Sequence, residues 1–134
     1  MSNENQTHKV ETGKLFSDDR GSIHPLNTNF GNVQIIKSNA GAVRANHYHL
    51  TDSHLCHVLS GKIRYFWRNR GEQNIVQETI SEGESFLTGP NIEHEMVFLE
   101  NSVMVVVSEF QRDTESYEKD IVRIPSLSES ETRA

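Results

Sequence analysis

Short runs of β-branched and aromatic residues, separated by turn residues, are the feature that most constrains the fold of this chain. They recur from about residue 33 to residue 110. No stretch has the 3.6-residue apolar period of a long helix. Evenly spaced short strands with turn signals predict an all-β fold, a sandwich or a small barrel. The runs span residues 33–38, 55–59, 63–67, 75–80, 85–88, 94–99 and 102–110.

The dipeptide Ser60-Gly61 separates two of these runs, residues 55–59 and 63–67. Two strand-like runs on either side of a short glycine turn are typical of a β-hairpin. We therefore expect these two strands to pair with each other.

The length of 134 residues fits one domain with a single core. We place that domain at residues 15–125. Residues 1–14 are polar and lack periodicity, which predicts a flexible N-terminal arm. The chain becomes charged from about Asp113, and residues 126–134 are predicted to form a disordered C-terminal tail.

The chain is acidic, with a formal net charge of -6. This charge argues against nucleic acid and anionic membranes as main partners. The longest apolar stretch, residues 103–107, is far too short to span a bilayer. The N-terminus has no apolar signal segment, and a single cysteine, Cys56, excludes an intrachain disulfide. We therefore expect a cytoplasmic protein whose partner is a small-molecule ligand.

Four histidines have the spacing that a metal site on adjacent strands needs. His47, His49 and His54 lie close together, and His94 follows on a later strand-like run. Because side chains alternate along a strand, His47 and His49 point to the same face. Neutral imidazole is the commonest protein ligand for divalent transition metals. The pair alone already predicts a bidentate clamp.

The segment 41–61 resembles the first motif of the cupin superfamily, G-x5-H-x-H-x3/4-E-x6-G, with His54 standing where the motif has glutamate. Gly83 and His94 match the second motif, G-x5-P-x-G-x2-H-x3-N, more loosely. The resemblance covers about residues 33–110. It implies a cupin jelly-roll barrel, also called a double-stranded β-helix, and it implies that the metal ligands are His47, His49, His54 and His94.

A second resemblance lies upstream, where Asp18-Asp19-Arg20-Gly21 is similar to the D-x-R-G opening of cupins that act on nucleotide-linked deoxysugars. These cupins are epimerases and ketoisomerases. The stretch from Arg44 to His49 resembles the R-G-N-H-x-H sequence of some of them. The resemblance implies that Arg20 contacts a substrate phosphate. In such enzymes a histidine of the first motif often acts as a base, here His49, and many of them need no metal.

The predicted ligands limit the identity of the metal. All-nitrogen ligation suits a divalent transition metal such as Zn, Fe, Ni or Cu better than Mg or Ca. Four neutral imidazoles leave the double charge of the ion intact, which makes it a stronger Lewis acid than a carboxylate would allow. Alternatively, His54 stays outside the ligand set and leaves a three-histidine face with open positions. Because the ligands must be deprotonated, metal affinity is predicted to fall below about pH 6.

Strand alternation also predicts the walls of the cavity around the metal. Met96 and Phe98 share a strand face with His94, and Cys56 shares one with His54. We interpret Cys56 as a small buried hydrophobe of this wall rather than as a nucleophile.

Other polar residues are assigned by the same reasoning. Arg44, just before the ligands, is the candidate for contacting a substrate anion. His57 points away from the ligands and is interpreted as structural. The segment 117–120 is interpreted as a surface segment or a dimer contact. A solvated outer face is favoured over a phosphate clamp for the basic cluster Lys62, Arg64, Arg68 and Arg70.

Three functions of different kinds fit these features. The first is isomerisation or epimerisation of a small polar carbonyl compound, a sugar or sugar nucleotide, with His49 and Arg44 as catalytic residues. The second is an iron-dependent dioxygenase, and the third a non-catalytic small-molecule-binding protein. A homodimer formed through sheet edges or faces is expected. The expected substrate-binding residues are Arg20, Arg44, Cys56, Met96 and Phe98.

Overall fold

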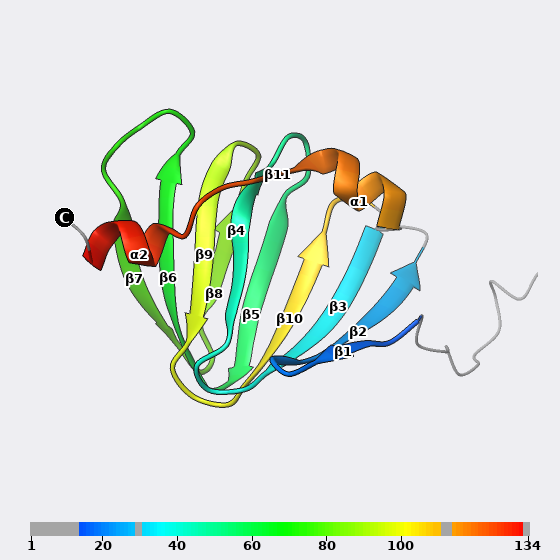
Figure 1. Ribbon diagram of the computed structural model, residues 1–134. Coiled ribbons are helices and arrows are strands. Elements are labelled where there is room, and N and C mark those ends of the chain that lie inside the picture. The colour runs from blue at the N-terminus through cyan, green and yellow to red at the C-terminus, as the bar shows by residue number, and fades with distance from the viewer. Residues whose placement is uncertain (1–13, 29–30, 111–113, 133–134) are drawn as a thin grey trace, which may run out of the picture.

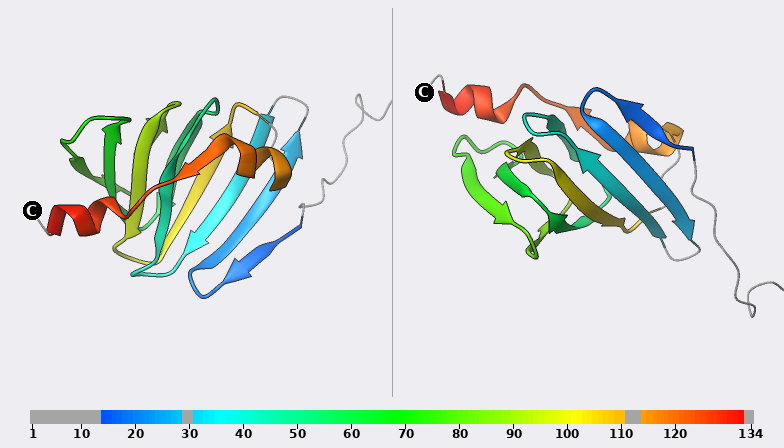
Figure 2. Two further views of the ribbon diagram at one scale, coloured as in Figure 1. Left: turned by 45° about the horizontal axis from the view of Figure 1, so that its top comes forward. Right: turned by 90° about the horizontal axis from the view of Figure 1, so that it is seen from below.

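The computed structural model describes residues 14–28, 31–110 and 114–132, and strands dominate this part of the chain. The strands form two antiparallel sheets that pack face to face (Figures 1 and 2). The six-stranded sheet has the order β1-β2-β3-β10-β5-β8, and the five-stranded sheet has the order β11-β4-β9-β6-β7. The predicted N-terminal arm, residues 1–14, falls outside the described residues except for Lys14.

The six-stranded sheet consists of β1 (Phe16–Asp18), β2 (Gly21–Thr28), β3 (Gly31–Ser38), β10 (Ser102–Ser108), β5 (His54–Ser60) and β8 (Ser85–Thr88). The five-stranded sheet consists of β11 (Ile121–Arg123), β4 (Val43–His49), β9 (Ile92–Phe98), β6 (Lys62–Asn69) and β7 (Val76–Ser81). Two short helices, α1 (Thr114–Asp120) and α2 (Leu127–Thr132), flank β11.

Side chains from the facing sides of both sheets form one hydrophobic core. In β9, Phe98 is fully buried and pairs with Ile63 of β6. His94 lies four residues earlier on β9, or about 13 Å along the strand. Phe98 and Ile63 therefore lie at the end of β9 away from His94. Members of the core from the two sheets include Ile36, Val58, Ile63, Phe98 and Met104.

The turn at Gly61 connects the two sheets instead of closing a hairpin. β5 pairs with β10 and β8, whereas β6 pairs with β9 and β7, so the prediction that these two strands pair is wrong. Gly61 has a φ of 100°, and a side chain there would overlap Ser102. The glycine signal marks a tight turn correctly, but it does not specify which strands pair.

The C-terminal segment is ordered further than its composition predicts. Disorder was expected from residue 126, but α2 begins at Leu127, which is fully buried. The buried carboxylate of Glu95 accepts hydrogen bonds from the Ser126 hydroxyl and from the Ser128 amide and hydroxyl, at 2.6–2.9 Å. Glu95 on β9 thus joins Ser126, whose hydroxyl accepts from the Glu129 amide, in capping the start of this helix.

No helix among residues 14–28, 31–110 and 114–132 combines the length and the apolar character that a membrane crossing requires.

Candidate functional site

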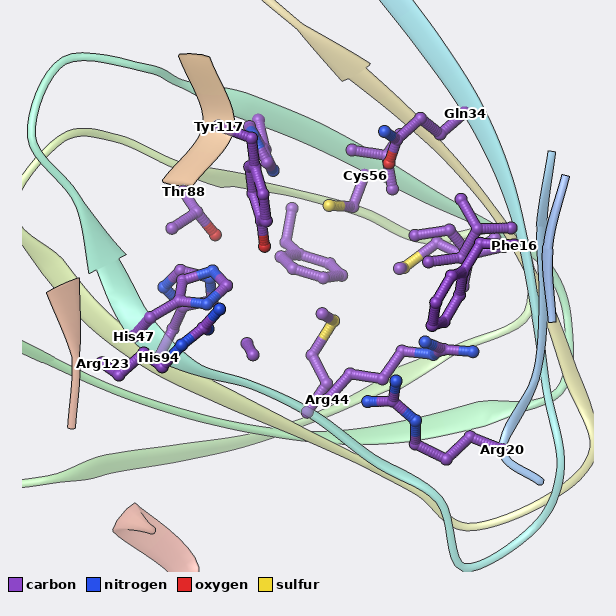
Figure 3. Close-up of a pocket in the computed structure, with 18 of the residues that line it drawn as sticks. Phe16, Arg20, Gln34, Arg44, His47, Cys56, Thr88, His94, Tyr117 and Arg123 are labelled. Atoms are coloured by element: carbon purple, nitrogen blue, oxygen red, sulfur yellow. The ribbon is translucent and has the colours of Figure 1, made fainter. Parts of the chain in front are cut away.

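A cavity of about 370 Å³ lies between the two sheets, and the histidines that were predicted as ligands lie at one side of it (Figure 3). Its volume is within the range of small-molecule binding pockets. His47, His54 and His94 line it, together with residues of β2, β3, β8 and β10.

Three histidines from two neighbouring strands converge on one point. His47 and His49 come from β4, and His94 of β9 is the direct cross-strand partner of His47. All three are buried, and one possible ligand atom from each lies within 4.8 Å of the others. The ring centroid of His47 is 4.9 Å from that of His49 and 4.9 Å from that of His94. Strand alternation predicted that His47 and His49 lie together, and the motif spacing added His94 to this pair.

An irregularity in β4 brings one more residue to the cavity. The pairing of β4 with β9 shifts register between Ala45 and His47. Ala45 and Asn46 both have left-handed backbone angles, with φ of 77° and 58°. A β-bulge of this kind changes the alternation of side chains. Because of it, both Arg44 and His47 line the same cavity, although an odd number of positions separates them.

Hydrogen bonds fix the orientation of the His94 ring. Its Nδ1 lies 2.9 Å from the backbone oxygen of Ile92, which can only accept, so Nδ1 donates and Nε2 carries the lone pair. Burial lowers the pKa of His94 to about 3, although the hydrogen bond to Ile92 opposes the shift. The ring is therefore neutral near pH 7, the state that a metal ligand requires.

A carboxylate from the C-terminal segment orients His49. Nδ1 of His49 lies 3.1 Å from Oδ2 of Asp120, and the other carboxylate oxygen, Oδ1, accepts from the hydroxyl and amide of Thr51. Burial alone would raise the pKa of Asp120, but the hydrogen bonds from Thr51, His49 and the Asp52 amide lower it below its usual value. Because the ionised carboxylate only accepts, Nδ1 of His49 is the donor and its lone pair is on Nε2.

His54 lies beside this group and has its own carboxylate partner. Its ring centroid is 4.3 Å from that of His49, and its Nε2 is 3.1 Å from Oδ2 of Asp52. Burial would raise the pKa of Asp52, but the hydrogen bond and charge of His54 and the amides of Phe110 and Ser53 lower it. His49, Asp52 and His54 form a second set of potential ligands within 4.8 Å of one another. The four predicted histidines thus divide into two sets that share His49.

The donor set of His47, His49 and His94 fits a divalent transition metal. Three imidazoles suit such ions, and two of the rings donate Nδ1–H to protein acceptors, the usual arrangement around metal-ligating histidines. The sequence left open whether His54 completes the set or stays outside it. The structure groups its ligand atom with His49 and Asp52.

Two arginines form the other side of the cavity. Figure 3 places the guanidinium groups of Arg44 and Arg20 across the cavity from the rings of His47 and His94. Arg44 is only 6% exposed; its Nε donates to Ser38 Oγ at 2.9 Å. Burial, and then the charge of Arg20, lower the pKa of Arg44. Two guanidinium groups at one end of a polar cavity favour an anionic ligand group.

Arg20 is positioned by the turn before β2. Its side chain forms an ion pair with Asp18 at 2.6 Å, and its amide donates to the same carboxylate at 2.9 Å. Gly21, which follows, has a φ of 135°. The predicted polar turn is therefore present, and it aims Arg20 at the cavity.

The remaining predicted wall residues are only partly in place. Cys56 and Met96 line the cavity, but Phe98 belongs to the fully buried core and is not among the described lining residues. Phe98 points to the same side of β9 as His94, as predicted, but it lies too far along the strand to reach the cavity. His57 bonds Ser85 on the outer side of the sheet, as expected for a structural residue.

The predicted basic cluster faces outward on β6 and beyond. Arg68 pairs with Glu93 at 3.2 Å, Lys62 with Glu100 at 3.9 Å, and Arg70 lies over the Tyr48 ring. The cluster is absent from the described cavity wall, which supports the interpretation as a solvated face.

Sequence reasoning missed the contribution of the C-terminal segment. Residues 117–120 were interpreted as a surface segment or dimer contact, but Tyr117 lines the cavity and Asp120 binds His49. The Tyr117 ring lies 6.2 Å from the rings of both His47 and His49, and its hydroxyl points into the cavity (Figure 3). The pairing of β11 with β4, which lies more than 70 positions earlier in the sequence, brings Tyr117 and Asp120 to the site, so no local sequence pattern predicts their positions.

No protein-family model matches the chain, and no curated protein matches it in sequence. Several solved structures are nevertheless similar. CapF from Staphylococcus aureus, a capsular polysaccharide assembling protein, superposes with a TM-score of 0.75 at 21% identity, over 90% of this chain and 35% of CapF. This chain therefore spans about a third of CapF.

Two further structures are similar over nearly their whole length. KdgF from Halomonas sp. has a TM-score of 0.63 at 19% identity, over 83% of this chain and 94% of KdgF. The QdtA 3,4-ketoisomerase from Thermoanaerobacterium thermosaccharolyticum, a double mutant in complex with TDP, has a TM-score of 0.57 at 23% identity, over 85% of this chain and 84% of QdtA. At these identities the similarity concerns the fold.

Proposed function

We propose that this chain, a cupin-fold protein like these three structural neighbours, binds a divalent transition metal and isomerises or epimerises a small polar carbonyl compound, a sugar or sugar nucleotide. The proposed metal ligands are His47, His49 and His94. The observation that carries the proposal is their convergence within 4.8 Å at the wall of a cavity that also contains Arg20 and Arg44.

The cavity has histidines at one end and arginines at the other, which supports a substrate with a carbonyl group at one end and an anionic group at the other. A cation at the histidine end would supply a Lewis acid for a carbonyl oxygen. At the other end, Arg44 and Arg20 would bind an anionic group such as a phosphate. QdtA has been crystallised with TDP, and we extend a nucleoside diphosphate to this chain as the candidate anion. Cys56 and Met96 would pack against the less polar middle of the substrate.

His49 has two possible roles that exclude each other. Asp120 holds the tautomer with Nδ1–H, so Nε2 is the atom that either coordinates the cation or accepts a proton from the carbon next to the carbonyl. One nitrogen cannot do both at once. As a base, His49 would be stabilised in its protonated state by the Asp120 carboxylate. Tyr117, whose ring centroid is 6.2 Å from that of His49, would help to exclude water.

The test combines metal analysis with proton exchange. Protein purified without added metal is analysed for its elements, and keto sugars and their nucleoside diphosphate derivatives are then incubated with it in deuterated water. The proposal expects bound metal and deuterium at the carbon next to the carbonyl. Exchange that survives a chelator would assign the proton transfer to His49 as a metal-independent base. A lack of exchange with every such substrate contradicts the proposed reaction.

A three-histidine site also favours a second candidate, an iron-dependent dioxygenase, because oxygen activation requires open coordination positions. Iron in the purified protein and oxygen uptake with a candidate substrate would support it. Zinc or nickel without oxygen uptake would exclude it. If neither proton exchange nor oxygen uptake occurs but a ligand binds, the chain is a non-catalytic binding protein. In all three cases we propose a homodimer.

A further inference from the structure

Residues 114–132 contribute to the site although they belong to neither histidine motif. They comprise α1, β11 and α2, and we call them the C-terminal strap (Figure 1). α1 supplies Tyr117 to the cavity wall, and its last residue, Asp120, bonds Nδ1 of His49. β11 pairs with the part of β4 that carries His47 and His49. The orientation of His49 therefore depends on the position of the C-terminal strap.

The middle of the C-terminal strap has few contacts of its own. β11 has only three residues, and it is the edge strand of its sheet, so it pairs with β4 alone. Two backbone bonds extend this pairing, from the Ile124 amide to the Asn46 oxygen at 2.9 Å and from the Leu50 amide to the Asp120 oxygen at 2.7 Å. A short edge element with so few partners opens at a low cost in free energy. A second anchor would therefore determine how firmly Asp120 stays beside His49.

Glu95 provides this anchor from the outer side of β9. Its side chain is fully buried, and its carboxylate accepts three hydrogen bonds from the C-terminal strap. Oε1 accepts from the hydroxyls of Ser126 and Ser128 at 2.8 and 2.9 Å, and Oε2 accepts from the Ser128 amide at 2.6 Å. Leu127, between the two serines, is also fully buried. We call Glu95, Ser126 and Ser128 the latch.

The latch determines where α2 lies. This helix has six residues, too few to be stable without tertiary contacts. It packs on β6 and β9, the strand that carries Glu95. Hydrogen bonds to a carboxylate are roughly twice as strong as those between neutral groups, so the three bonds of the latch are a major part of this docking.

The connection from the latch to the site is short. Only Ile124 and Pro125 lie between the end of β11 and Ser126. Two residues span at most about 7 Å, and proline removes the freedom of one φ angle. At its other end, β11 begins directly after Asp120. A movement of α2 away from β9 is therefore transmitted to the carboxylate that orients His49.

We propose that Glu95 is a positioning residue for His49. By holding Ser126 and Ser128 it keeps the C-terminal strap in place, and the strap keeps the Asp120 carboxylate at Nδ1 of His49. Glu95 follows His94 on β9, but the two side chains point to opposite faces of the strand, and Glu95 is not among the described residues that line the cavity. The effect on metal affinity rests on the proposed function, whereas the orientation of His49 does not.

The test observes the ring N–H signals of the histidines by NMR in the full chain without metal. In the wild type we expect slowly exchanging Nδ1–H signals from His49, bonded to Asp120, and from His94, bonded to the Ile92 oxygen. Glu95→Ala removes the three acceptors of the latch. It should speed the exchange of the His49 signal at least about tenfold and leave the His94 signal unchanged.

Two further variants separate the latch from the strand that carries Glu95. Glu95→Gln should restore slow exchange, because its amide oxygen accepts from the Ser128 amide while its NH₂ group donates to the serine hydroxyls. The double variant Ser126→Ala, Ser128→Ala removes both hydroxyls without a change in β9, and it should speed the exchange of the His49 signal as well. Glu129→Gln, at an exposed position of α2, is the matched control and should behave like the wild type.

Two results of the NMR comparison would overturn the proposal. In the first, Glu95→Ala speeds the exchange of the His49 and His94 signals equally, which is a general loosening of the fold. In the second, the double serine variant leaves His49 unchanged although Glu95→Ala does not, which assigns the effect to β9.

Zinc titration of the same proteins measures the consequence for the metal site. Glu95→Ala should lower zinc affinity at least about fivefold in the wild-type background. In the Asp120→Asn background it should change the affinity less than about twofold, because the contact that the latch protects is already weakened. Equal losses in both backgrounds would overturn the proposal. If the wild type binds no zinc, the proposed metal site fails, and the NMR comparison alone decides the role of Glu95.

Discussion

At the scale of single residues, the direction of each imidazole matters as much as its position. Alternation along β4 placed His47 and His49 on one face, and the structure confirms that they lie together with His94. It could not predict the groups that orient the rings. Asp120 lies 71 positions from His49 in the sequence, so no spacing rule connects them. Ligand types can be found from local patterns, but their hydrogen-bond partners depend on the complete fold.

Replacing single histidines should separate ligands from neighbours. His47→Ala and His94→Ala each remove one of three converging nitrogens, so we expect metal affinity to fall at least tenfold in each. The measurement is a metal titration of protein from which a chelator has removed the bound metal. His57→Ala is the control, since its ring bonds Ser85 on the outer side of the sheet. His54→Ala should retain most of the affinity if His54 lies outside the ligand set. Full occupancy in His94→Ala would refute the proposed site.

Asp120→Asn tests the orienting carboxylate. The amide keeps an acceptor oxygen for Thr51 but removes the negative charge beside Nδ1 of His49. We expect a 10–100-fold loss of metal affinity, as is usual for such supporting residues. Asp19→Asn, outside this hydrogen-bond network, is a matched control. Equal metal affinity in the wild type and Asp120→Asn would show that the carboxylate serves only to hold the C-terminal segment.

At the scale of elements, the structure departs from the expected strand pattern at two places, and the first of them shapes the site. The bulge in β4 turns Arg44 toward the cavity, and the turn at Gly61 connects two sheets. The alternation rule assumes regular strands, so it cannot locate an inserted residue. The order of α2 was missed for a related reason. Ser126 and Glu129 have the spacing of a helix start, but Glu95, which also binds this start, belongs to a strand more than 30 positions away.

The bulge provides a stability prediction. Ala45 has a φ of 77°, a conformation that costs an alanine about 1 kcal/mol and that glycine adopts readily. The cupin stretch that resembles residues 44–49 has glycine at this position. Ala45→Gly should therefore raise the free energy of unfolding by up to about 1 kcal/mol, measured by chemical denaturation. Ala42→Gly, in the core outside the bulge, should lower it. A destabilised Ala45→Gly variant would contradict the argument.

At the scale of the whole molecule, the fold could be predicted because its determinants are repetitive. Evenly spaced strands and two histidine motifs predicted a jelly roll, and the two-sheet architecture confirms it. The cavity walls were predicted only where regular strands form them. Tyr117 reaches the cavity because α1 and β11 return to β4 after the barrel is complete, and that return depends on long-range pairing.

The acid sensitivity of the metal-free protein is a property of the whole molecule. The pKa of His94 is about 3 in the folded chain and about 6.5 when unfolded. Between these values the unfolded chain binds a proton that the folded chain does not, so stability is full above pH 6.5 and falls as the pH decreases toward 3. One such group lowers the free energy of unfolding by about 1.4 kcal/mol per pH unit within this window. The lowered pKa values of Asp52 and Asp120 add losses of the same sign at the acidic end.

Chemical denaturation of the metal-free protein at several pH values from 7.5 to 4 measures how the free energy of unfolding depends on pH. His94→Gln removes the titrating ring and should flatten the curve between pH 6.5 and 4. Asn69→Gln, a substitution without a titrating group on β6, is the control and should leave the slope nearly unchanged. The metal should oppose the loss, because a cation bound only by the folded chain adds to its stability. An unchanged pH dependence in His94→Gln would mean that other groups take up the protons. The burial of His94 would then contribute little to the loss of stability at low pH.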